Sequence, residues 1–245
     1  MMMMTGVTTC MITKRLDAQG NKYPLTRRKF NEKKLNVYFV RHAESQNNAL
    51  HETVKSKAEY MRLRSSDPKL SKIGEKQAEA LKFKMAREVP NGSKVSMWVS
   101  PLHRTLLTAQ PTAKALNIKP IVDAELFELY GCFQQVNGLQ VPFPGKTREE
   151  ISIEFPDYDT RSVRADGWYA TKDFETHEEC VVRASRLVRR LRKEVRRLQT
   201  TEDDTHDEHN IIIVSHGNFL SEVLKSILGT SNDVGYSCGN ASVTK

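Results

Sequence analysis

The sequence predicts an α/β fold, a three-layer sandwich in which a mostly parallel central sheet is flanked by helices. Three short runs rich in strand-forming residues occur at 35–40, 94–100 and 210–215. Each is followed, directly or after a loop, by a stretch in which apolar residues recur at helical spacing. Strands that are apolar on both faces and alternate with helices are typical of a parallel sheet covered on both sides.

The first run, LNVYFV, leads into a loop that begins with Arg41 and His42. A helix is predicted from Ser71 onward, because a serine at this position can accept hydrogen bonds from the free N–H groups of the first turn. The residues that give this helix its apolar face are Ile73, Ala78, Leu81 and Met85.

The second run is followed by a helix predicted to begin near Pro101, since proline fits the first turn of a helix. The third run, NIIIVS, precedes a helix over 218–228 that Gly229 is expected to end. Residues 183–198 predict a further helix with arginines on one face, which we interpret as solvated, with docking of an acidic partner as the alternative. Its apolar face comprises Val181, Ala184, Val188, Leu191, Val195 and Leu198.

Length and composition fit one large folded domain. The chain has 245 residues, 38% of them hydrophobic and 28% charged, and no apolar run approaches the roughly 20 residues that a membrane span needs. The cysteines are scattered without a C-x-x-C pair, so we expect no zinc site and no disulfide framework. A reducing, cytoplasmic compartment follows as the default. The cysteines are Cys10, Cys132, Cys180 and Cys238.

The net charge of +8 is partly concentrated in the first 34 residues. We expect residues 1–34 to form a basic, flexible extension ahead of a domain spanning 35–245. The extension lacks the apolar stretch of a secretory signal, although its basic, acid-poor start would also suit a mitochondrial presequence. The charge favours an anionic partner, which we expect to be a phosphorylated small molecule or a phosphoprotein rather than nucleic acid. The sequence does not indicate an oligomeric state.

Each predicted strand ends beside residues that can do chemistry. Arg41 and His42 follow the first, Arg104 follows the second, and His216 follows the third. The carboxyl ends of parallel strands open onto the ligand crevice of such a sheet, and helix amino termini add positive potential there. Two arginines and two histidines at one edge predict a phosphoryl site, because guanidinium forks match its oxygens and imidazole can attack phosphorus.

Each of these residues has a simpler explanation when taken alone. A single histidine after a strand is more often structural, and an arginine in a turn is usually a surface charge. The coincidence at three strand ends is what favours a shared site.

At these residues the sequence resembles the histidine phosphatase superfamily, the phosphoglycerate-mutase-like family. The family's opening Arg-His-Gly-Glu-Ser/Thr motif is matched by RHAESQNN, in which Ala43 replaces the usual glycine. The motifs LSKIGEKQAEAL, SPLHRTLLTA and VSHGNFL follow in the family's order, so that the resemblance covers roughly residues 35–244. The positions of RHAESQNN that match are Arg41, His42, Glu44, Ser45 and Asn48.

The resemblance implies a covalent mechanism that needs no metal or cofactor. His42 would attack phosphorus and become phosphohistidine, and nearby cations would lower its pKa and keep it neutral. The residues implied to bind the phosphoryl oxygens are Arg41, Ser45, Asn48, Arg104 and His216.

The resemblance also implies an acid that protonates the leaving group. The corresponding segment is ELFELYGCF, in which Glu128 is the expected proton donor and Glu125 the competitor. The same carboxylate would then act as base for the water that hydrolyses phosphohistidine.

Residues 131–167 are expected to form a lid that determines substrate choice. Its cations would either contact a second anionic group of the substrate or be solvated, and they are Lys146, Arg148, Arg161 and Arg164. The motif HDEH at 206–209 lies in an acidic stretch, which we interpret as a solvated connection rather than a metal site.

Hydrolysis is the expected activity. A mutase of this family would carry an Arg-His-Tyr-Gly pattern after the acid, which ELYGCFQQVNGL lacks. A family fold kept as a scaffold or binding protein is the third alternative. Members of the family usually continue beyond the strand that GNASVTK resembles, which implies either a shorter sheet or a truncated chain.

Overall fold

A computed structural model describes residues 33–170, 173–200, 208–231 and 233–245. The predictions for residues 1–32 therefore lie outside the described part of the chain. The central sheet has five strands in the order β3-β2-β6-β1-β7, of which β7 alone is antiparallel to its neighbour. Their bounds are β1 (Lys34–Arg41), β2 (Lys94–Val99), β3 (Ile121–Val122), β6 (Glu208–Ser215) and β7 (Val243–Thr244).

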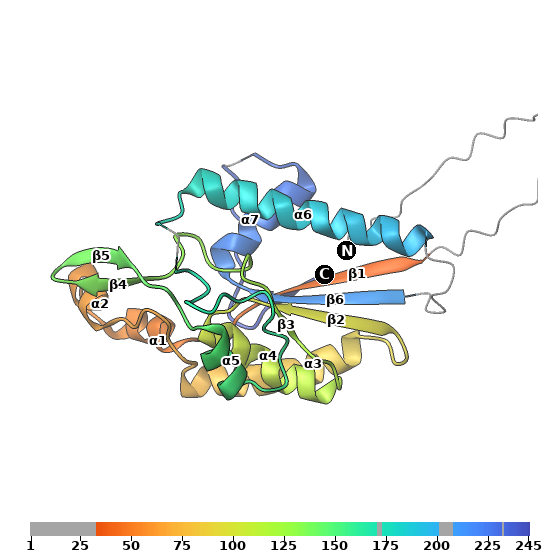
Figure 1. Ribbon diagram of the computed structural model, residues 1–245, viewed down its shortest axis with the longest axis horizontal. Helices are drawn as coiled ribbons and strands as arrows, with labels where there is room; N and C mark the ends of the chain where they lie inside the picture. The colour runs from red at the N-terminus through yellow and green to blue at the C-terminus, as the bar shows by residue number, and fades with distance from the viewer. Residues whose placement is uncertain (1–32, 171–172, 201–207, 232) are drawn as a thin grey trace, which may run out of the picture.

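Helices cover both faces of the sheet, as Figure 1 shows. On one face lie α3 (Lys72–Glu88) and α4 (His103–Ala115), and on the other lie α6 (His177–Thr200) and α7 (Gly217–Leu228). The predicted three-layer α/β sandwich is therefore confirmed. No helix in the described ranges is both long and apolar enough to cross a membrane.

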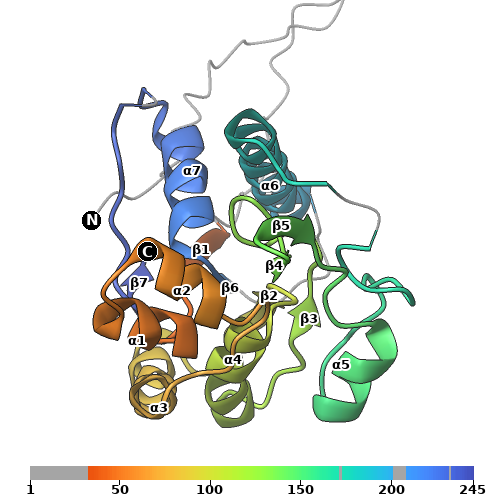
Figure 2. The same ribbon diagram turned by 90° about the vertical axis from the view of Figure 1, so that its left-hand side faces the viewer.

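The carboxyl ends of β1, β2 and β6 all point toward the end of the molecule that faces the viewer in Figure 2. The smaller elements lie around this end. They are α1 (Gln46–Thr53), α2 (Lys57–Leu63), the hairpin of β4 (Phe133–Val136) and β5 (Leu139–Pro142), and α5 (Arg148–Glu154).

Strand β6 is the centre of the sheet and begins earlier than predicted. It pairs with β1 along its length, with Leu35 opposite His209, and it pairs with β2 on its other side. His209 is only 5% exposed, so its interpretation as part of a solvated connection is wrong. The reason is that pairing with β1 extends the strand back to Glu208, which forms an ion pair with Lys34 at 3.1 Å.

Helix α3 has the predicted cap but a slightly different buried face. The Ser71 side chain accepts a hydrogen bond from the N–H of Gly74, as expected. Ala78, Leu81 and Met85 are buried, but Ile73 is 58% exposed. The helix turns Gly74 inward instead, where it touches the Glu44 backbone so closely that a Cβ would lie 2.0 Å from the Glu44 carbonyl oxygen.

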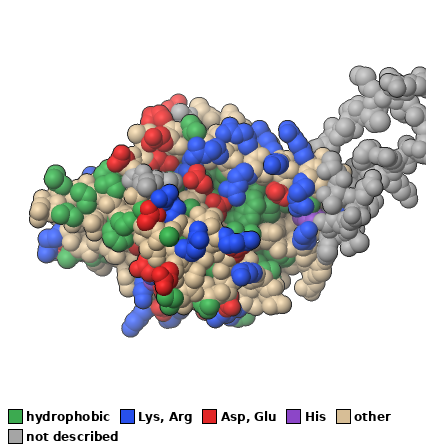
Figure 3. All heavy atoms as spheres, in the orientation of Figure 1, with side chains coloured by type: hydrophobic (Ala, Val, Ile, Leu, Met, Phe, Trp, Pro, Cys, Tyr) green, Lys and Arg blue, Asp and Glu red, His purple; other side chains and the backbone are tan. Residues whose placement is uncertain are grey.

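Helix α6 is longer than predicted and buries one arginine. Arg183 is 1% exposed, so the expectation that all arginines lie on the outer face is wrong. The remaining Lys and Arg side chains cover the outside of α6 (Figure 3). Of the predicted apolar face, Ala184, Val188, Leu191 and Leu198 are buried, whereas Val195 is 38% exposed.

The other predicted helix ends agree with the structure. Helix α4 begins at His103, two residues after Pro101. Helix α7 ends at Gly229, whose φ of 66° is in the left-handed region that glycine adopts without strain. The late strand predicted from the final residues is β7, which pairs with Phe39 and Val40 of β1.

Candidate active site

The structure brings the four strand-end residues together. His42 follows β1, Arg104 lies in the first turn of α4, and His216 precedes α7. The ring centroids of His42 and His216 are 5.2 Å apart, and Arg104 Nη2 lies 3.1 Å from His216 Nδ1. Both imidazoles are buried. Three separate motifs therefore bring their side chains into one polar cluster at the carboxyl edge of the sheet, which we call the pocket.

His42 is fixed in one orientation. Its backbone N–H donates to the Ser215 carbonyl oxygen at 2.9 Å, and its Nδ1 lies 2.7 Å from the Ala43 carbonyl oxygen. A carbonyl only accepts hydrogen bonds, so Nδ1 carries the hydrogen and Nε2 presents its lone pair. Ala43 itself is fully buried, and its N–H donates to the Thr108 hydroxyl at 3.0 Å.

Burial lowers the pKa of His42 well below its usual range, and the charges of Arg104 and Arg41 lower it further. The sequence predicted this direction from the cations alone, but the loss of solvation is the larger cause. A neutral imidazole with a free Nε2 is the form that can act as a nucleophile.

His216 is held by neighbours on both ring nitrogens. Its Nδ1 accepts from Arg104, and its Nε2 lies 2.7 Å from the Ser100 hydroxyl oxygen. Burial, followed by the charge of Arg104, lowers the pKa of His216 well below its usual range. The neutral ring therefore donates from Nε2 to Ser100 and has no N–H directed at a ligand in this arrangement.

Arg41 contributes an unused donor. Its Nη1 donates to the Cys238 carbonyl oxygen at 2.6 Å. Its Nε is buried and has no hydrogen-bond partner among the described residues. A Cβ at Gly217 would lie 3.3 Å from this nitrogen, so glycine leaves room beside it. A buried donor without a partner is costly, and a bound oxyanion would satisfy it.

Ser45 and Asn48 mainly bind each other. Ser45 caps α1: its hydroxyl accepts from the Asn48 N–H at 3.2 Å and donates to Asn48 Oδ1 at 2.8 Å. Asn48 Oδ1 also accepts from the Ser45 N–H at 3.0 Å. Both functions of the Ser45 hydroxyl are thus used in the cap, whereas Asn48 keeps an amide N–H group that bonds to nothing in the described ranges.

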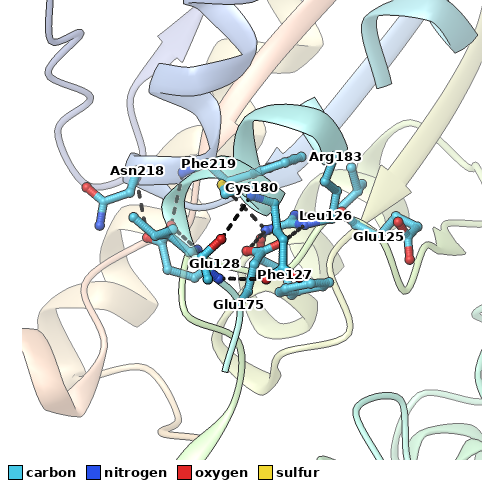
Figure 4. A network of polar contacts seen from close by, with 12 residues as sticks. Glu125, Leu126, Phe127, Glu128, Glu175, Cys180, Arg183, Asn218 and Phe219 are labelled. Atoms are coloured by element: carbon cyan, nitrogen blue, oxygen red, sulfur yellow. Dashed lines mark hydrogen bonds and ion pairs between the residues drawn. The ribbon is translucent and has the colours of Figure 1, made fainter. Parts of the chain in front are cut away.

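The Glu128 side chain contacts the amino terminus of α7, the helix that begins directly after His216. Its Oε1 accepts from the Phe219 N–H at 3.0 Å (Figure 4). The same oxygen accepts from the Leu129 N–H at 2.9 Å. Its charge also counteracts the lowering of the Arg104 pKa that burial causes. Glu125 instead pairs with the exposed Arg186 of α6 at 3.1 Å. The geometry therefore favours Glu128 over its competitor as the carboxylate of the pocket.

The loop before Glu128 is held by Arg183, which sequence reasoning missed. Arg183 Nη1 donates to the carbonyl oxygens of Glu125 at 2.8 Å and Phe127 at 2.9 Å (Figure 4). Its guanidinium is paired with Glu175 at 2.6 Å and stacks on the Phe127 ring, 3.6 Å from the centroid. The available signal was its position three residues after Cys180, on the buried face of α6.

Asp67 is a second residue that sequence reasoning missed. Its Oδ1 accepts from the His103 N–H at 2.8 Å, where α4 begins, and its Oδ2 is buried without a partner among the described residues. Burial raises the pKa of Asp67 to about 6, although Arg104 acts in the opposite direction. It lies three residues before the LSKIGEKQA motif, which was the signal that could have identified it.

The predicted lid, residues 131–167, contains β4, β5 and α5, and its cations are bound within it. Lys146 pairs with Glu154 at 2.6 Å, Arg161 with Asp159 at 2.5 Å, and Arg164 with Asp166 at 2.8 Å. Arg148 donates to the Val163 and Arg161 carbonyl oxygens. These contacts do not support the expectation that the four cations bind a second anion of the substrate.

Glu154 also joins this segment to the pocket, because it lies 2.5 Å from His103 Nε2. Across the described ranges, no three His, Cys, Asp or Glu side chains gather as the ligands of a metal ion would.

Comparison with known proteins places this fold in a family. The structure is similar to an ecdysone phosphate phosphatase from Bombix mori, with 15% identity, a TM-score of 0.54, and coverage of 84% of this chain and 86% of that one. A mycobacterial glucosyl-3-phosphoglycerate phosphatase has 18% identity and a TM-score of 0.51, with 84% and 87% covered. A protein described as mycobacterial hydrolase 2 has 22% identity and a TM-score of 0.52, with 84% and 79% covered.

These likenesses concern the fold. No curated protein sequence matches the chain. Residues 37–245, however, match the sequence profile of the histidine phosphatase superfamily, branch 1. The protein therefore belongs to the histidine phosphatase superfamily.

Proposed function

We propose that this protein is a metal-independent phosphomonoester hydrolase that works through a phosphohistidine at His42. The observation that carries the proposal is the state of His42: buried, neutral, and held by Ala43 so that Nε2 presents its lone pair. Arg104 and the unpartnered Nε of Arg41 provide positive charge for the phosphoryl oxygens.

In the first step, His42 Nε2 forms a bond to phosphorus while the bond from phosphorus to the leaving oxygen breaks. Glu128 takes up a proton from solvent when the substrate dianion binds beside it, and it gives that proton to the leaving oxygen, so the alcohol leaves neutral. The Nδ1–H of His42 remains hydrogen-bonded to the Ala43 carbonyl oxygen, and this hydrogen bond stabilises the positive charge of the phosphorylated ring.

His216 and Arg104 exchange partners during this step. A phosphoryl dianion attracts the Arg104 fork away from His216 Nδ1. The same dianion favours transfer of a proton from solvent to that nitrogen, which then donates to a phosphoryl oxygen. The Ser100 hydroxyl keeps the ring in place through Nε2. The phosphoryl group thereby receives a hydrogen bond from His216, whose ring directs no N–H at a ligand in the free protein.

In the second step, water attacks phosphorus and Glu128, now a carboxylate, takes its proton. The bond from phosphorus to Nε2 breaks, its electron pair returns to the imidazole, and inorganic phosphate leaves. The backbone N–H groups of α7 hold the Glu128 carboxylate in position for both roles. Two similar structures are named for phosphatases of small phosphate esters, which agrees with a small phosphomonoester as substrate.

The experiment is phosphate release from an aryl phosphate in the presence of a chelator, comparing the parent with His42→Asn. The matched control is His51→Asn, because the His51 side chain is 71% exposed on α1. Chelator-insensitive turnover that His42→Asn abolishes and His51→Asn retains is the expected result. Equal activity of the parent and His42→Asn would overturn the proposal.

Mutase and scaffold activities are separated by the same preparation. A mutase would release little phosphate and would instead transfer the phosphoryl group to an added acceptor alcohol. A scaffold would show neither reaction with a correctly folded parent.

A further inference from the structure

A further arginine lies next to the pocket. Arg64 directly follows α2 as its C-cap, and its backbone N–H donates to the Tyr60 carbonyl oxygen. Its charge is close enough to Arg104 to lower the pKa of that residue. Two guanidinium groups that repel each other are costly to keep together, and a bound anion removes the cost.

The Arg64 side chain is oriented before any ligand binds. Its guanidinium lies 4.0 Å from the centroid of the Phe133 ring, and its Nη1 donates to the Phe133 carbonyl oxygen at 3.2 Å. Phe133 in turn contacts Phe174, with ring centroids 5.8 Å apart. A guanidinium held in this way loses little side-chain entropy when it binds an anion.

The charge of Arg64 is not neutralised. In the described part of the chain it has no carboxylate within ion-pair distance, whereas Lys146, Arg161 and Arg164 of the lid each have one. A ring face and a carbonyl oxygen orient the guanidinium but leave its net charge intact. Arg64 is therefore an oriented cation near Arg104 that has the capacity to bind a further anion.

The position of Arg64 indicates which part of the substrate it meets. Phe133 begins β4, five residues after Glu128, which under the proposed function protonates the leaving oxygen. The hairpin of β4 and β5 lies beside α2 at the carboxyl end of the sheet (Figure 2). Exposed apolar side chains gather at this end (Figure 3), and they include Leu63, Val136 and Leu139.

We propose that Arg64 binds a second oxyanion, carried by the leaving group of the substrate. The substrate class is thereby a phosphomonoester whose alcohol bears a carboxylate or a second phosphate, joined by a body that contacts apolar side chains. This inference rests on the proposed function for the direction of the leaving group. Under this inference Arg64, and not the cations of residues 131–167, determines substrate specificity.

Binding of non-hydrolysable phosphonates tests the inference without requiring turnover. Calorimetry would compare benzylphosphonate with 4-carboxybenzylphosphonate and with p-xylylenebisphosphonate, which share the benzylphosphonate core and differ in the para substituent. The parent is expected to bind at least one doubly anionic compound about tenfold more tightly, the value of one charge-assisted hydrogen bond. The doubly anionic compound that binds more tightly shows whether Arg64 prefers a carboxylate or a second phosphate.

Two arginine variants locate the effect. Arg64→Met is expected to abolish the preference while leaving the Kd of benzylphosphonate within about twofold, because one charge-assisted contact is lost. Arg64→Lys should keep part of the preference, since it keeps the charge and loses the fork. Arg164→Met is the matched control, because Arg164 lies in the lid and is paired with Asp166.

No preference in the parent, or a preference that Arg64→Met retains, would overturn the inference. An equal loss of affinity for all three compounds in Arg64→Met would also overturn it. A parent that binds the compounds with the expected preference but releases no phosphate from aryl esters would contradict only the proposed hydrolysis.

Discussion

The proposed phosphoryl site and the segment predicted to be a lid, residues 131–167, are built in different ways. His42 and His216 directly follow the paired parallel strands β1 and β6, and Arg104 lies in the first turn of the helix that follows β2. The lid consists of a two-stranded hairpin, one short helix and loops, and its charged side chains mostly bind one another. We infer that the proposed chemistry depends on the sheet more than on residues 131–167.

The largest expected effect is that of Arg104→Met. Loss of the fork that lies beside His216 Nδ1 should lower kcat by about 10²–10³-fold, as loss of an oxyanion donor does, while the fold is retained. Steady-state kinetics on an aryl phosphate measure it. The matched control is Arg87→Met, on the exposed end of α3, and it should retain parent kinetics. Similar kinetics for both variants would remove Arg104 from the pocket's chemistry.

Arg183→Met should reduce both stability and activity, because it leaves Glu175 buried without its partner and releases the loop before Glu128. The free energy of unfolding is expected to fall by about 3–5 kcal/mol, measured by urea denaturation. Arg186→Met removes an exposed pair with Glu125 instead and should cost less than about 1 kcal/mol. Equal losses in the two variants would contradict the structural role assigned to Arg183.

Asp67→Asn tests the buried carboxyl next to Arg104. Burial raises the pKa of Asp67 in the folded state to about 6, from its ordinary value of 3.8. The folded state therefore binds more protons than the unfolded state between these values, so the carboxyl reduces stability as pH rises toward neutrality.

Asparagine does not titrate, so the stability of Asp67→Asn relative to the parent should be higher at pH 8 than at pH 5. The change in unfolding free energy caused by the substitution should differ by about 1–2 kcal/mol between the two pH values. Urea denaturation at both pH values measures it. A difference of the opposite sign would show that Asp67 is ionised more easily in the folded state.

The smallest effect is expected from Arg164→Met in the lid. Arg164 and Asp166 form an exposed pair at 2.8 Å, which makes a weak contribution in water. The free energy of unfolding should change by less than about 1 kcal/mol, and kcat for a simple aryl phosphate should stay within about twofold. A tenfold loss of kcat would mean that the lid takes part in the chemistry and would end the distinction between the two regions.

The same distinction explains what the sequence could predict. Local sequence pattern was enough to predict the strands, the cap at Ser71 and the end of the helix at Gly229. The convergence of His42 with His216 follows from the rule that the carboxyl ends of parallel strands share one edge of the sheet. The burial of His209 at the start of β6, by contrast, depends on pairing with β1. The position of Gly74 on the buried face of α3 depends on its contact with the Glu44 backbone.

Side-chain partners that are distant in sequence were the least predictable. Arg183 binds carbonyl groups more than 50 positions earlier in the chain, at Glu125 and Phe127, and no local pattern indicates such a contact. The pairing of lid cations with nearby carboxylates was likewise hidden, because spacing alone does not show which way a loop side chain turns.

The measurement that tests the central claim most directly is a rapid-quench single turnover with a ³²P-labelled aryl phosphate. Denatured protein would be digested under alkaline conditions, which preserve phosphohistidine, and the labelled peptide identified by mass spectrometry. We expect a phosphoryl group on Nε2 of His42 that forms and decays at least as fast as turnover. Turnover without a covalent intermediate, or label on His216, would contradict it.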